Sequence, residues 1–328
     1  MTVLVTGAAG FIGYHTAAAL LARGEQVVGL DEVNDYYDVA LKEARLARLG
    51  ASDDFRFVRA DIADRESVAR VVVDHSDIDR VVHLAAQAGV RHSLVDPYAY
   101  TRANVEGHLV LLEACRTLPV LKHFVYASSS SVYGGNTQMP FSVEERVDRP
   151  LSLYAATKRA GELMAQSYAY IHRVPQTGLR FFTVYGPWGR PDMAAYIFAR
   201  KILAGEPIEV FNNGEMARDF TYIDDIIAGV LACLDRPPKD DGETPPHRVY
   251  NLGNHHAEPL MRFISVLEDA LGKKAEIDFK PMQKGDVAET FADIEASRRD
   301  LGFEPRTGID EGIPRFIDWY RDYHGIDA

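Results

Sequence analysis

The stretch Val3-Leu4-Val5-Thr6-Gly7-Ala8-Ala9-Gly10-Phe11-Ile12-Gly13 decides the fold of this chain. Its apolar start predicts a short buried strand, and the residues from about Phe11 to Arg23, ended by Gly24, have a helical pattern. A glycine-rich turn that joins such a strand to such a helix exposes the amide groups of the helix N-terminus. These groups bind anions, so the stretch predicts a phosphate-binding loop.

The three glycines of the loop have the spacing GxxGxxG, which differs from the common GxGxxG form. Gly7 permits the tight turn, Gly10 lets the backbone approach a pyrophosphate, and Gly13 lets the helix pack closely on the sheet. Isolated glycine patterns of this kind also occur in simple tight turns. The strand before the loop and the helix after it favour a dinucleotide site, and we expect Gly7, Gly10, Phe11, Ile12 and Gly13 to contact the dinucleotide.

The next predicted strand, Gln26 to Leu30, closes on Asp31. A carboxylate at this position accepts hydrogen bonds from the adenosine ribose hydroxyls and repels a 2′-phosphate, which favours NAD over NADP. Glu32 adds a charge of the same sign. Asp61 and Ile62 follow the third strand and are expected on the adenine side of the cofactor. For Asp61, capping of a helix is the alternative.

Strand and helix signals alternate through the first half of the chain, which is typical of parallel strands with helices on both faces. The sequence therefore predicts an α/β fold, a Rossmann-type doubly wound parallel sheet with a smaller α/β substrate-binding C-terminal lobe. We expect residues 1–182 and about 221–253 to form the NAD-binding domain, and about 183–220 and 254–328 to form the substrate lobe. Further strands are expected at Phe55–Val58, Arg80–Leu84, His123–Ala127, Thr177–Phe181 and Arg248–Leu252, and helices at about Pro97–Thr117, Ser152–Arg173 and Tyr222–Leu234.

The composition limits the class of protein. The chain has 328 residues, of which 47% are hydrophobic and 26% charged, and its net charge is −12. This acidic balance argues against a nucleic-acid partner, although a few arginines can still hold a phosphate-bearing ligand. Cys115 and Cys233 form no CxxC pair, so no zinc site, other metal site or disulfide framework is indicated, and the cytoplasm is the expected compartment. No apolar run reaches the ~20 residues of a membrane helix, so no membrane partner is expected.

Tyr154 and Lys158 are four residues apart in a predicted helix and therefore share one face. A nearby ammonium stabilises a phenolate and lowers the pKa of the tyrosine, which yields a base that works near neutral pH. Alone, such a pair is an ordinary feature of helix surfaces. Upstream, however, residues 125–134 lead from a predicted strand into a loop with four serines. The carboxyl ends of parallel strands bind ligands in such folds, and a hydroxyl there polarises a substrate hydroxyl or ketone.

The glycine loop, Asp31, the serine loop and the Tyr154/Lys158 pair together resemble the extended short-chain dehydrogenase/reductase family, over essentially the whole chain. The resemblance implies that Ser129 completes a catalytic set with the tyrosine and the lysine. It also implies a homodimer that forms through the two long helices. The cofactor-lining positions that it implies are Leu84, Ala85, Ala86, Asn104, Tyr154 and Lys158, of which Asn104 also supports the catalytic set.

Three further stretches, 179–193, 217–225 and 285–293, resemble the UDP-glucuronate 4-epimerases within that family. Ala288 departs from their pattern, because proline is usual at this position, and we interpret the departure as local. The resemblance thus implies a UDP-sugar substrate with a carboxylate.

A carboxylate on the sugar needs polar partners, and arginine and hydroxyl groups suit a planar anion. Our candidates for this role are Ser130, Ser131, Thr183 and Arg190, with a loop ion pair as the alternative role of Arg190. Arg218 is the candidate for the diphosphate. By resemblance, Gln283 and Asp286 lie near the diphosphate and the uridine ribose, and the stretch Glu209–Phe211, with Val210 and Phe211, contacts uracil.

The expected reaction starts when Tyr154 removes the proton of the sugar 4-hydroxyl while a hydride leaves C4 for NAD⁺. Return of the hydride to the other face of the 4-keto sugar inverts C4 and converts UDP-glucuronate into UDP-galacturonate. Dehydratases and decarboxylases of the family carry an acidic residue where this chain has Ser130 and Ser131, which disfavours elimination. Decarboxylation stays an alternative, because a 4-keto uronate is a β-keto acid, and so does epimerisation of UDP-galactose. A non-catalytic NAD-sensing protein is the alternative from another class, and the complete catalytic set argues against it.

Overall fold

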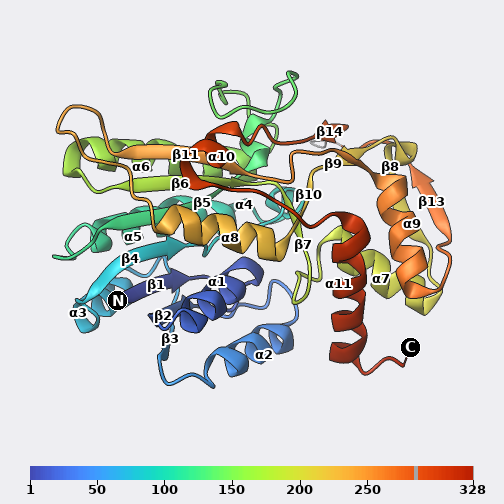
Figure 1. The fold of residues 1–328 in the computed structure, drawn as a ribbon, viewed down its shortest axis with the longest axis horizontal. Coiled ribbons are helices and arrows are strands. Elements are labelled where there is room, and N and C mark those ends of the chain that lie inside the picture. The colour runs from blue at the N-terminus through green and yellow to red at the C-terminus, as the bar shows by residue number, and fades with distance from the viewer. Residues whose placement is uncertain (284–286, 328) are drawn as a thin grey trace.

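The computed structural model describes residues 1–283 and 287–327, which form a large α/β domain beside a smaller lobe (Figure 1). The large domain is built on a seven-stranded parallel sheet, so the predicted fold class is confirmed. The order of the strands reverses between β1 and β4, and ligands bind at such a switch point. In spatial order the strands are β11 (His247–Leu252), β6 (Gln176–Phe181), β5 (His123–Ser129), β4 (Ile78–His83), β1 (Thr2–Thr6), β2 (Gln26–Asp31) and β3 (Phe55–Arg59), each within two residues of its predicted ends.

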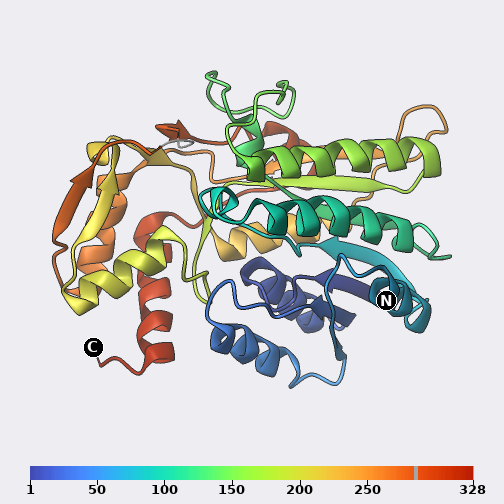
Figure 2. The same ribbon diagram turned by 180° about the vertical axis from the view of Figure 1, so that it is seen from behind.

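Helices cover both faces of this sheet (Figures 1 and 2). Successive side chains of a strand point to opposite faces. Val3 and Val5 accordingly belong to one hydrophobic core and Leu4 to the other, and all three are fully buried. Burial on both faces is the reason why the strand reads as a continuous apolar run. Helices α1 (Phe11–Ala22), α2 (Val39–Leu49) and α8 (Ile223–Leu234) cover one face, and α3 (Arg65–Asp74), α5 (His108–Cys115) and α6 (Leu153–His172) cover the other.

The two long helices of the prediction differ in regularity. The segment predicted as one helix consists of α4 (Pro97–Thr101), a π-helical segment (Arg102–Gly107) and α5. A π-helical segment adds one residue to a turn and often lies at a functional site. The second helix, α6, agrees with the prediction, and the side chain of Ser152 caps it by accepting a hydrogen bond from Ala155 N. None of the described helices combines the length and apolar character that crossing a membrane requires.

The smaller lobe is built from short strands and three helices, on the right in Figure 1. Its strands form one parallel pair against the end of the large sheet, a second parallel pair at the outer edge and a small mixed sheet between them. These elements are β7 (Thr183–Tyr185) with β10 (Phe220–Tyr222), β8 (Ile208–Phe211) with β13 (Ile277–Lys280), and β9 (Ala217–Arg218) between β12 (Glu258–Pro259) and β14 (Glu289–Thr290), with helices α7 (Ala194–Ala204), α9 (Leu260–Leu271) and α11 (Ile309–His324).

Helix α10 (Glu295–Leu301) departs from the predicted division of the chain, which assigned residues 254–328 to the substrate lobe. The helix packs on the large domain beside β11 (Figure 1). Ser297 Oγ donates a hydrogen bond to Asn251 O, and Leu301 is buried against the core of that domain. The buried serine and leucine tie this short helix to the large sheet, which a division by sequence order could not anticipate. With this change, the arrangement supports the two-part division, which we retain as a proposal.

Candidate active site

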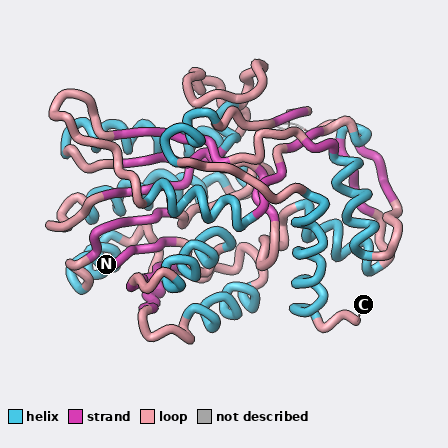
Figure 3. Tube along the Cα trace, viewed as in Figure 1, coloured by secondary structure: helices cyan, strands magenta, loops and turns pink. Residues whose placement is uncertain are grey.

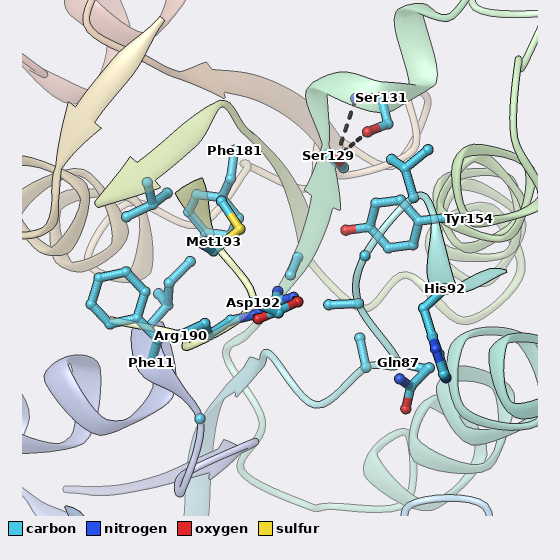
Figure 4. A pocket seen from close by; sticks show the side chains of 18 of the residues that line it. Phe11, Gln87, His92, Ser129, Ser131, Tyr154, Phe181, Arg190, Asp192 and Met193 are labelled. Carbon is cyan, nitrogen blue, oxygen red and sulfur yellow. Dashed lines mark hydrogen bonds and ion pairs between the residues drawn. The ribbon is translucent and has the colours of Figure 1, made fainter. Parts of the chain in front are cut away.

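A cavity of about 780 Å³ lies between the large domain and the smaller lobe, at the carboxyl ends of the central strands. The glycine loop, the serine loop and the first turns of α6 line it on the side of the large domain. The loop after β7 and the strands β8 and β9 line it on the other side. Figure 4 shows side chains from both sides that point into this space. Most of the predicted cofactor and substrate residues therefore lie around one cavity; among the described residues, Asn104, Val210 and Gln283 do not line it.

The glycine loop has the geometry that its sequence predicts. Gly7 adopts a left-handed conformation, with φ +73°, and a Cβ atom there would lie 2.7 Å from Ala85 N. A Cβ atom at Gly13 would lie 1.9 Å from the carbonyl oxygen of Gly7. Side chains at these two positions would thus collide with backbone, which explains the need for glycine. Gly7, Gly10, Phe11, Ile12 and Gly13 all line the cavity.

Asp31 ends β2 beside this loop and lines the same cavity. Its carboxylate accepts hydrogen bonds from Ala9 N at 3.0 Å and from Val33 N at 2.8 Å. These bonds hold the carboxylate next to the anion-binding loop. The loop, which leaves no room for side chains, and the fixed carboxylate fit a dinucleotide with free ribose hydroxyls, which is the chemistry of NAD.

Asp61 does not cap a helix. The N-cap of α3 is Asp64, whose side chain accepts hydrogen bonds from Glu66 N and Ser67 N. Asp61 instead pairs with Arg102, at 2.6 Å, and lines the cavity together with Ile62. The capping interpretation is therefore wrong, and the position of Asp61 at the cavity is compatible with the cofactor role that we continue to propose.

The loop after β4 forms the floor of the cavity, where Leu84, Ala85 and Ala86 line it. Asn104 lies behind this floor, in the π-helical segment, and does not line the cavity. Its side-chain oxygen accepts a hydrogen bond from Gln87 N, and its Nδ2 donates to Gln87 O, both at 2.9 Å. Nδ2 also lies 3.0 Å from Thr157 Oγ1 on α6. Asn104 therefore connects the loop after β4 to helix α6 by hydrogen bonds, and its side chain does not reach the cavity itself.

The three predicted catalytic residues meet at the cavity. Ser129 ends β5, and its hydroxyl lies 3.1 Å from Ser131 Oγ in the turn that follows (Figure 4). Tyr154 and Lys158 lie on successive turns of α6, and the phenol points into the cavity (Figure 4). Lys158 Nζ donates a hydrogen bond to the carbonyl of Ala127 in β5, at 2.9 Å. Strand β5 and helix α6 thus bring hydroxyl, phenol and ammonium together.

The pKa of Tyr154 differs from the sequence-based expectation. Burial raises the pKa of the Tyr154 phenol, and the Ser129 hydroxyl and the charge of Arg190 lower it to a smaller extent. Burial also lowers the pKa of Lys158 to about 8. The prediction that Lys158 gives the tyrosine a lowered pKa is therefore wrong for the chain alone, because loss of solvent outweighs the neighbouring charges.

Glu162 extends the stripe of Tyr154 and Lys158 by one more turn, and the sequence analysis missed it. It is buried, and its carboxylate accepts hydrogen bonds from Ser128 Oγ at 2.6 Å and from Arg180 Nε and a terminal guanidinium nitrogen at 2.8 and 2.9 Å. Burial raises the pKa of Glu162, but the guanidinium of Arg180 outweighs this and holds that pKa below its usual range. The spacing of four residues after Lys158 is the signal that could have revealed it.

Thr183 and Arg190 face the cavity from the side of the smaller lobe. Arg190 forms a two-point ion pair with Asp192, with contacts of 3.0 and 2.5 Å, and the Tyr36 hydroxyl donates to the same carboxylate at 3.1 Å. Arg190 therefore forms an ion pair within its loop, which was the alternative role that we considered for it. It lines the same cavity as Tyr154 (Figure 4), and its charge lowers the pKa of that tyrosine. Sequence reasoning missed Tyr36 and Asp192, which join only in the folded chain.

The remaining substrate candidates differ in whether they line the cavity. Arg218 lines the cavity and donates hydrogen bonds to the carbonyls of Ala217, Ala288 and Val287. Phe211 lines it too, with the guanidinium of Arg91, a residue that the sequence analysis missed, 4.7 Å from its ring centre. The side chain of Val210 is fully buried in the core, and neither Val210 nor Gln283 lines the cavity. Asp286 lies outside the described residues.

Comparison with known proteins agrees with this site. A model of the NAD dependent epimerase/dehydratase family matches residues 3–253. The chain is 48% identical over 337 residues to UDP-glucuronate 4-epimerase 4 of Arabidopsis thaliana, an alignment that covers 100% of this chain and 77% of that protein. It is 44% identical to a probable UDP-glucuronate 4-epimerase of Rhizobium meliloti, an alignment that covers 98% of this chain and 97% of that protein.

A solved structure is similar to the chain over nearly its whole length. The crystal structure of UDP-glucuronic acid 4-epimerase from Bacillus cereus, in complex with UDP-glucuronic acid and NAD, matches with a TM-score of 0.90 and 35% identity, covering 98% of this chain and 100% of that one. The chain therefore belongs to the NAD-dependent epimerase/dehydratase family.

Proposed function

We propose that this protein is an NAD-dependent epimerase that inverts C4 of UDP-glucuronic acid to give UDP-galacturonic acid. The observation that carries the proposal is the meeting of Ser129, Tyr154 and Lys158 at the cavity that the glycine loop also lines. A phenol that points into this space can exchange a proton with a sugar hydroxyl. The two relatives named UDP-glucuronate 4-epimerase, which are 48% and 44% identical to the chain over the aligned residues, support the assignment of the sugar.

In the proposed reaction, Tyr154 takes the proton of the 4-hydroxyl and later returns it to the inverted 4-oxygen. The Ser129 hydroxyl donates a hydrogen bond to the 4-oxygen. Lys158 lies one helical turn from Tyr154 and completes the proposed catalytic set. Bound NAD would supply the acceptor for the C4 hydride and, in reduced form, the donor for its return to the other face of the 4-keto sugar. The chain keeps the dinucleotide bound between the two steps, so no NAD is consumed.

The residues that would hold NAD are those of the glycine loop and the end of β2. The backbone amides of the loop face the diphosphate, and Asp31 accepts hydrogen bonds from the adenosine ribose. We propose that the remaining predicted positions complete this site, with Asn104 acting through the backbone of Gln87. These positions are Asp61, Ile62, Leu84, Ala85, Ala86, Tyr154 and Lys158.

The sugar carboxylate is assigned to the cavity wall around Arg190. Ser130 and Ser131 follow the catalytic serine directly, Thr183 begins β7, and all three line the cavity with Arg190. This set offers hydroxyl donors and a guanidinium that its ion pair with Asp192 holds in place. With hydroxyl groups at positions 130 and 131, the site has no acid beside the catalytic serine to assist elimination.

The nucleotide part of the substrate is assigned to strands β8 and β9. Arg218 is proposed for the diphosphate and the Phe211 ring for stacking with uracil, while Val210 can contribute only backbone groups because its side chain is buried. Gln283 and Asp286 stay proposals by resemblance for the diphosphate and the ribose.

A homodimer is part of the proposal. Helices α5 and α6 run side by side over the near face in Figure 2. Along these helices and the adjoining α4, the large apolar side chains of Tyr98, Leu163, Tyr170 and Ile171 are 82, 55, 66 and 62% exposed. Such a row of exposed apolar groups is typical of an interface. Cys115 and Cys233 are free and buried, which supports the cytoplasm as the proposed compartment.

One experiment tests the proposed function. The purified protein, with no added NAD, is incubated with UDP-glucuronate and followed by NMR, and the dinucleotide released by denaturation is identified by mass spectrometry. We expect UDP-galacturonate to form and NAD to be released. Loss of CO₂ would instead identify a decarboxylase. Turnover of UDP-galactose but not of UDP-glucuronate would identify a UDP-galactose 4-epimerase, and failure of every UDP-sugar to react would favour an NAD-sensing protein.

A further inference from the structure

Arg45, on α2, is fully buried and does not line the cavity. Burial of a guanidinium is costly unless its N–H groups are hydrogen-bonded. Within the described part of the chain, its hydrogen-bond partners are three backbone carbonyls and one phenol, and none is a carboxylate. A buried guanidinium that donates its hydrogen bonds to backbone carbonyls can hold segments of the chain in place.

The two terminal nitrogens of Arg45 face two different loops. One donates to Ala9 O in the glycine loop and to the Tyr37 hydroxyl, both at 2.8 Å. The other lies 2.5 Å from Trp188 O and 3.3 Å from Gly189 O. These four contacts use all four N–H groups of the two nitrogens. A single planar group thus joins the glycine loop to the segment that directly precedes Arg190.

A second side chain makes the same connection. His15, on α1, places Nε2 2.9 Å from Pro187 O. Burial lowers the pKa of His15 to about 4, so the ring is neutral near pH 7, and the protonated nitrogen of one tautomer can donate to this carbonyl. The helix that begins at the glycine loop is therefore also bonded to the segment before Arg190.

The backbone of this segment is strained, and its one large side chain is half-buried among aromatic rings. Trp188 has φ +61°, in the left-handed region that a bulky residue rarely adopts. Its ring packs against Tyr14 at 5.5 Å and against Trp319 and Tyr323 at 5.4 Å. A strained conformation persists only when its surroundings hold it, and such strain often lies at a functional site.

We propose that Arg45 is a positioning residue that ties the dinucleotide loop to Arg190 and so sets the affinity for the carboxylate of the sugar. The inference rests on the proposed function, because it takes Arg190 as a partner of that carboxylate. Arg190 follows Gly189 directly, so a shift of the Trp188 and Gly189 carbonyls moves its guanidinium. A displacement of ~1 Å in such a group can cost as much as a hundredfold in rate.

The test uses the variant Arg45→Lys, which keeps the charge but cannot bond to both loops at once. Binding of UDP-glucuronate and of UDP, which lacks the sugar, is measured by calorimetry on the dinucleotide-loaded protein. We expect about a tenfold weaker affinity for UDP-glucuronate and less than a twofold change for UDP, because only the sugar end faces Arg190. Equal weakening of both ligands, or of neither, would overturn the proposal.

Arg48→Lys is the matched control. Arg48 lies on the same helix and 5.3 Å from the ring of Trp188, and it bonds to the Tyr14 hydroxyl, but it contacts no carbonyl of the segment. It should leave both affinities unchanged. If Arg45→Lys does not fold, His15→Phe removes the bond to Pro187 O and should weaken UDP-glucuronate binding about threefold, with UDP again unaffected. An unchanged affinity in His15→Phe would then count against the proposal.

Hydrogen exchange separates this inference from the proposed function. In Arg45→Lys, or in His15→Phe if the first variant does not fold, the amides of residues 187–193 should exchange at least several-fold faster, whatever sugar the enzyme uses. If the wild-type protein does not bind UDP-glucuronate but this exchange increases, the proposed function fails and the positioning role stands. If the wild-type protein binds UDP-glucuronate and neither the exchange nor the affinity changes in the variant, the positioning role fails alone.

Discussion

The two walls of the cavity are built in different ways. The catalytic wall, with Ser129, Tyr154 and Lys158, consists of the end of a buried strand and the first turns of a twenty-residue helix. The substrate wall, with Arg190 and Arg218, consists of a loop and a two-residue strand. Regular backbone positions the first set. In the second, the ion pair with Asp192 holds Arg190, and Arg218 donates hydrogen bonds to the carbonyls of residues 287 and 288. In the proposed reaction, the proton chemistry is thus built into the large domain, and the choice of sugar depends on a loop that other segments hold.

The largest expected effect lies on the catalytic wall. Tyr154→Phe removes the hydroxyl that exchanges the proton and leaves the ring in place, so we expect turnover to fall by about a thousandfold. The NAD content and the affinity for UDP-glucuronate should stay close to those of the wild type. Steady-state rates by NMR and the dinucleotide content by absorbance check this. A loss of less than tenfold would remove Tyr154 from its role as acid and base.

Glu162 lies buried on α6, beneath the catalytic wall. The substitution Glu162→Gln should reduce the stability of the protein more than a substitution that breaks a surface ion pair. The variant leaves the buried Arg180 without its charged partner, and we expect the free energy of unfolding to fall by about 3 kcal/mol. Denaturant unfolding measures this. The control is Glu113→Gln, which breaks a surface ion pair with Arg116 and should cost less than about 0.5 kcal/mol. Equal losses of unfolding free energy in the two variants would show that the buried Glu162–Arg180 pair matters no more for stability than a surface ion pair.

Lys158→Met should abolish turnover and yet stabilise the dinucleotide-free protein at pH 7, by about 3 kcal/mol. The pKa of Lys158 in the folded chain, about 8, lies below its ordinary value of 10.5, so at pH 7 folding must bury a charged ammonium. Between pH 8 and 10.5 the folded chain binds fewer protons than the unfolded chain, and the stability of the wild type rises relative to the variant. Unfolding free energies at pH 7 and pH 9.5 check this. A difference that does not shrink at the higher pH would contradict it.

The smallest expected effect lies on the substrate wall. Arg190→Lys loses the two-point ion pair with Asp192, and we expect kcat/KM for UDP-glucuronate to fall about tenfold. Affinity for UDP should not change, because the nucleotide lies at the other end of the substrate in the proposed arrangement. Competition between UDP-glucuronate and UDP measures both values in one assay. A change in UDP affinity as large as that in kcat/KM would place Arg190 elsewhere in the site.

Sequence reasoning succeeded where a function depends on neighbours in the chain. The glycine loop follows from the need for backbone space, and the shared face of Tyr154 and Lys158 follows from the helical repeat. The central strands of the large sheet were predictable because their burial on both faces requires apolar runs. The π-helical segment around Asn104 was not, because no local pattern marks where a helix gains a residue.

Sequence pattern thus specified the doubly wound sheet and the glycine loop with Asp31 nearby, and it predicted that Tyr154 and Lys158 share one face of a helix. Only the folded chain decided that burial raises the pKa of Tyr154, that Asp192 and Tyr36 hold Arg190, and that Arg45 joins two loops. The reason is physical: spacing along a strand or helix determines which groups share a face, whereas desolvation and the reach of a long side chain depend on segments far apart in the chain, such as Tyr36 and Asp192, which are 156 residues apart.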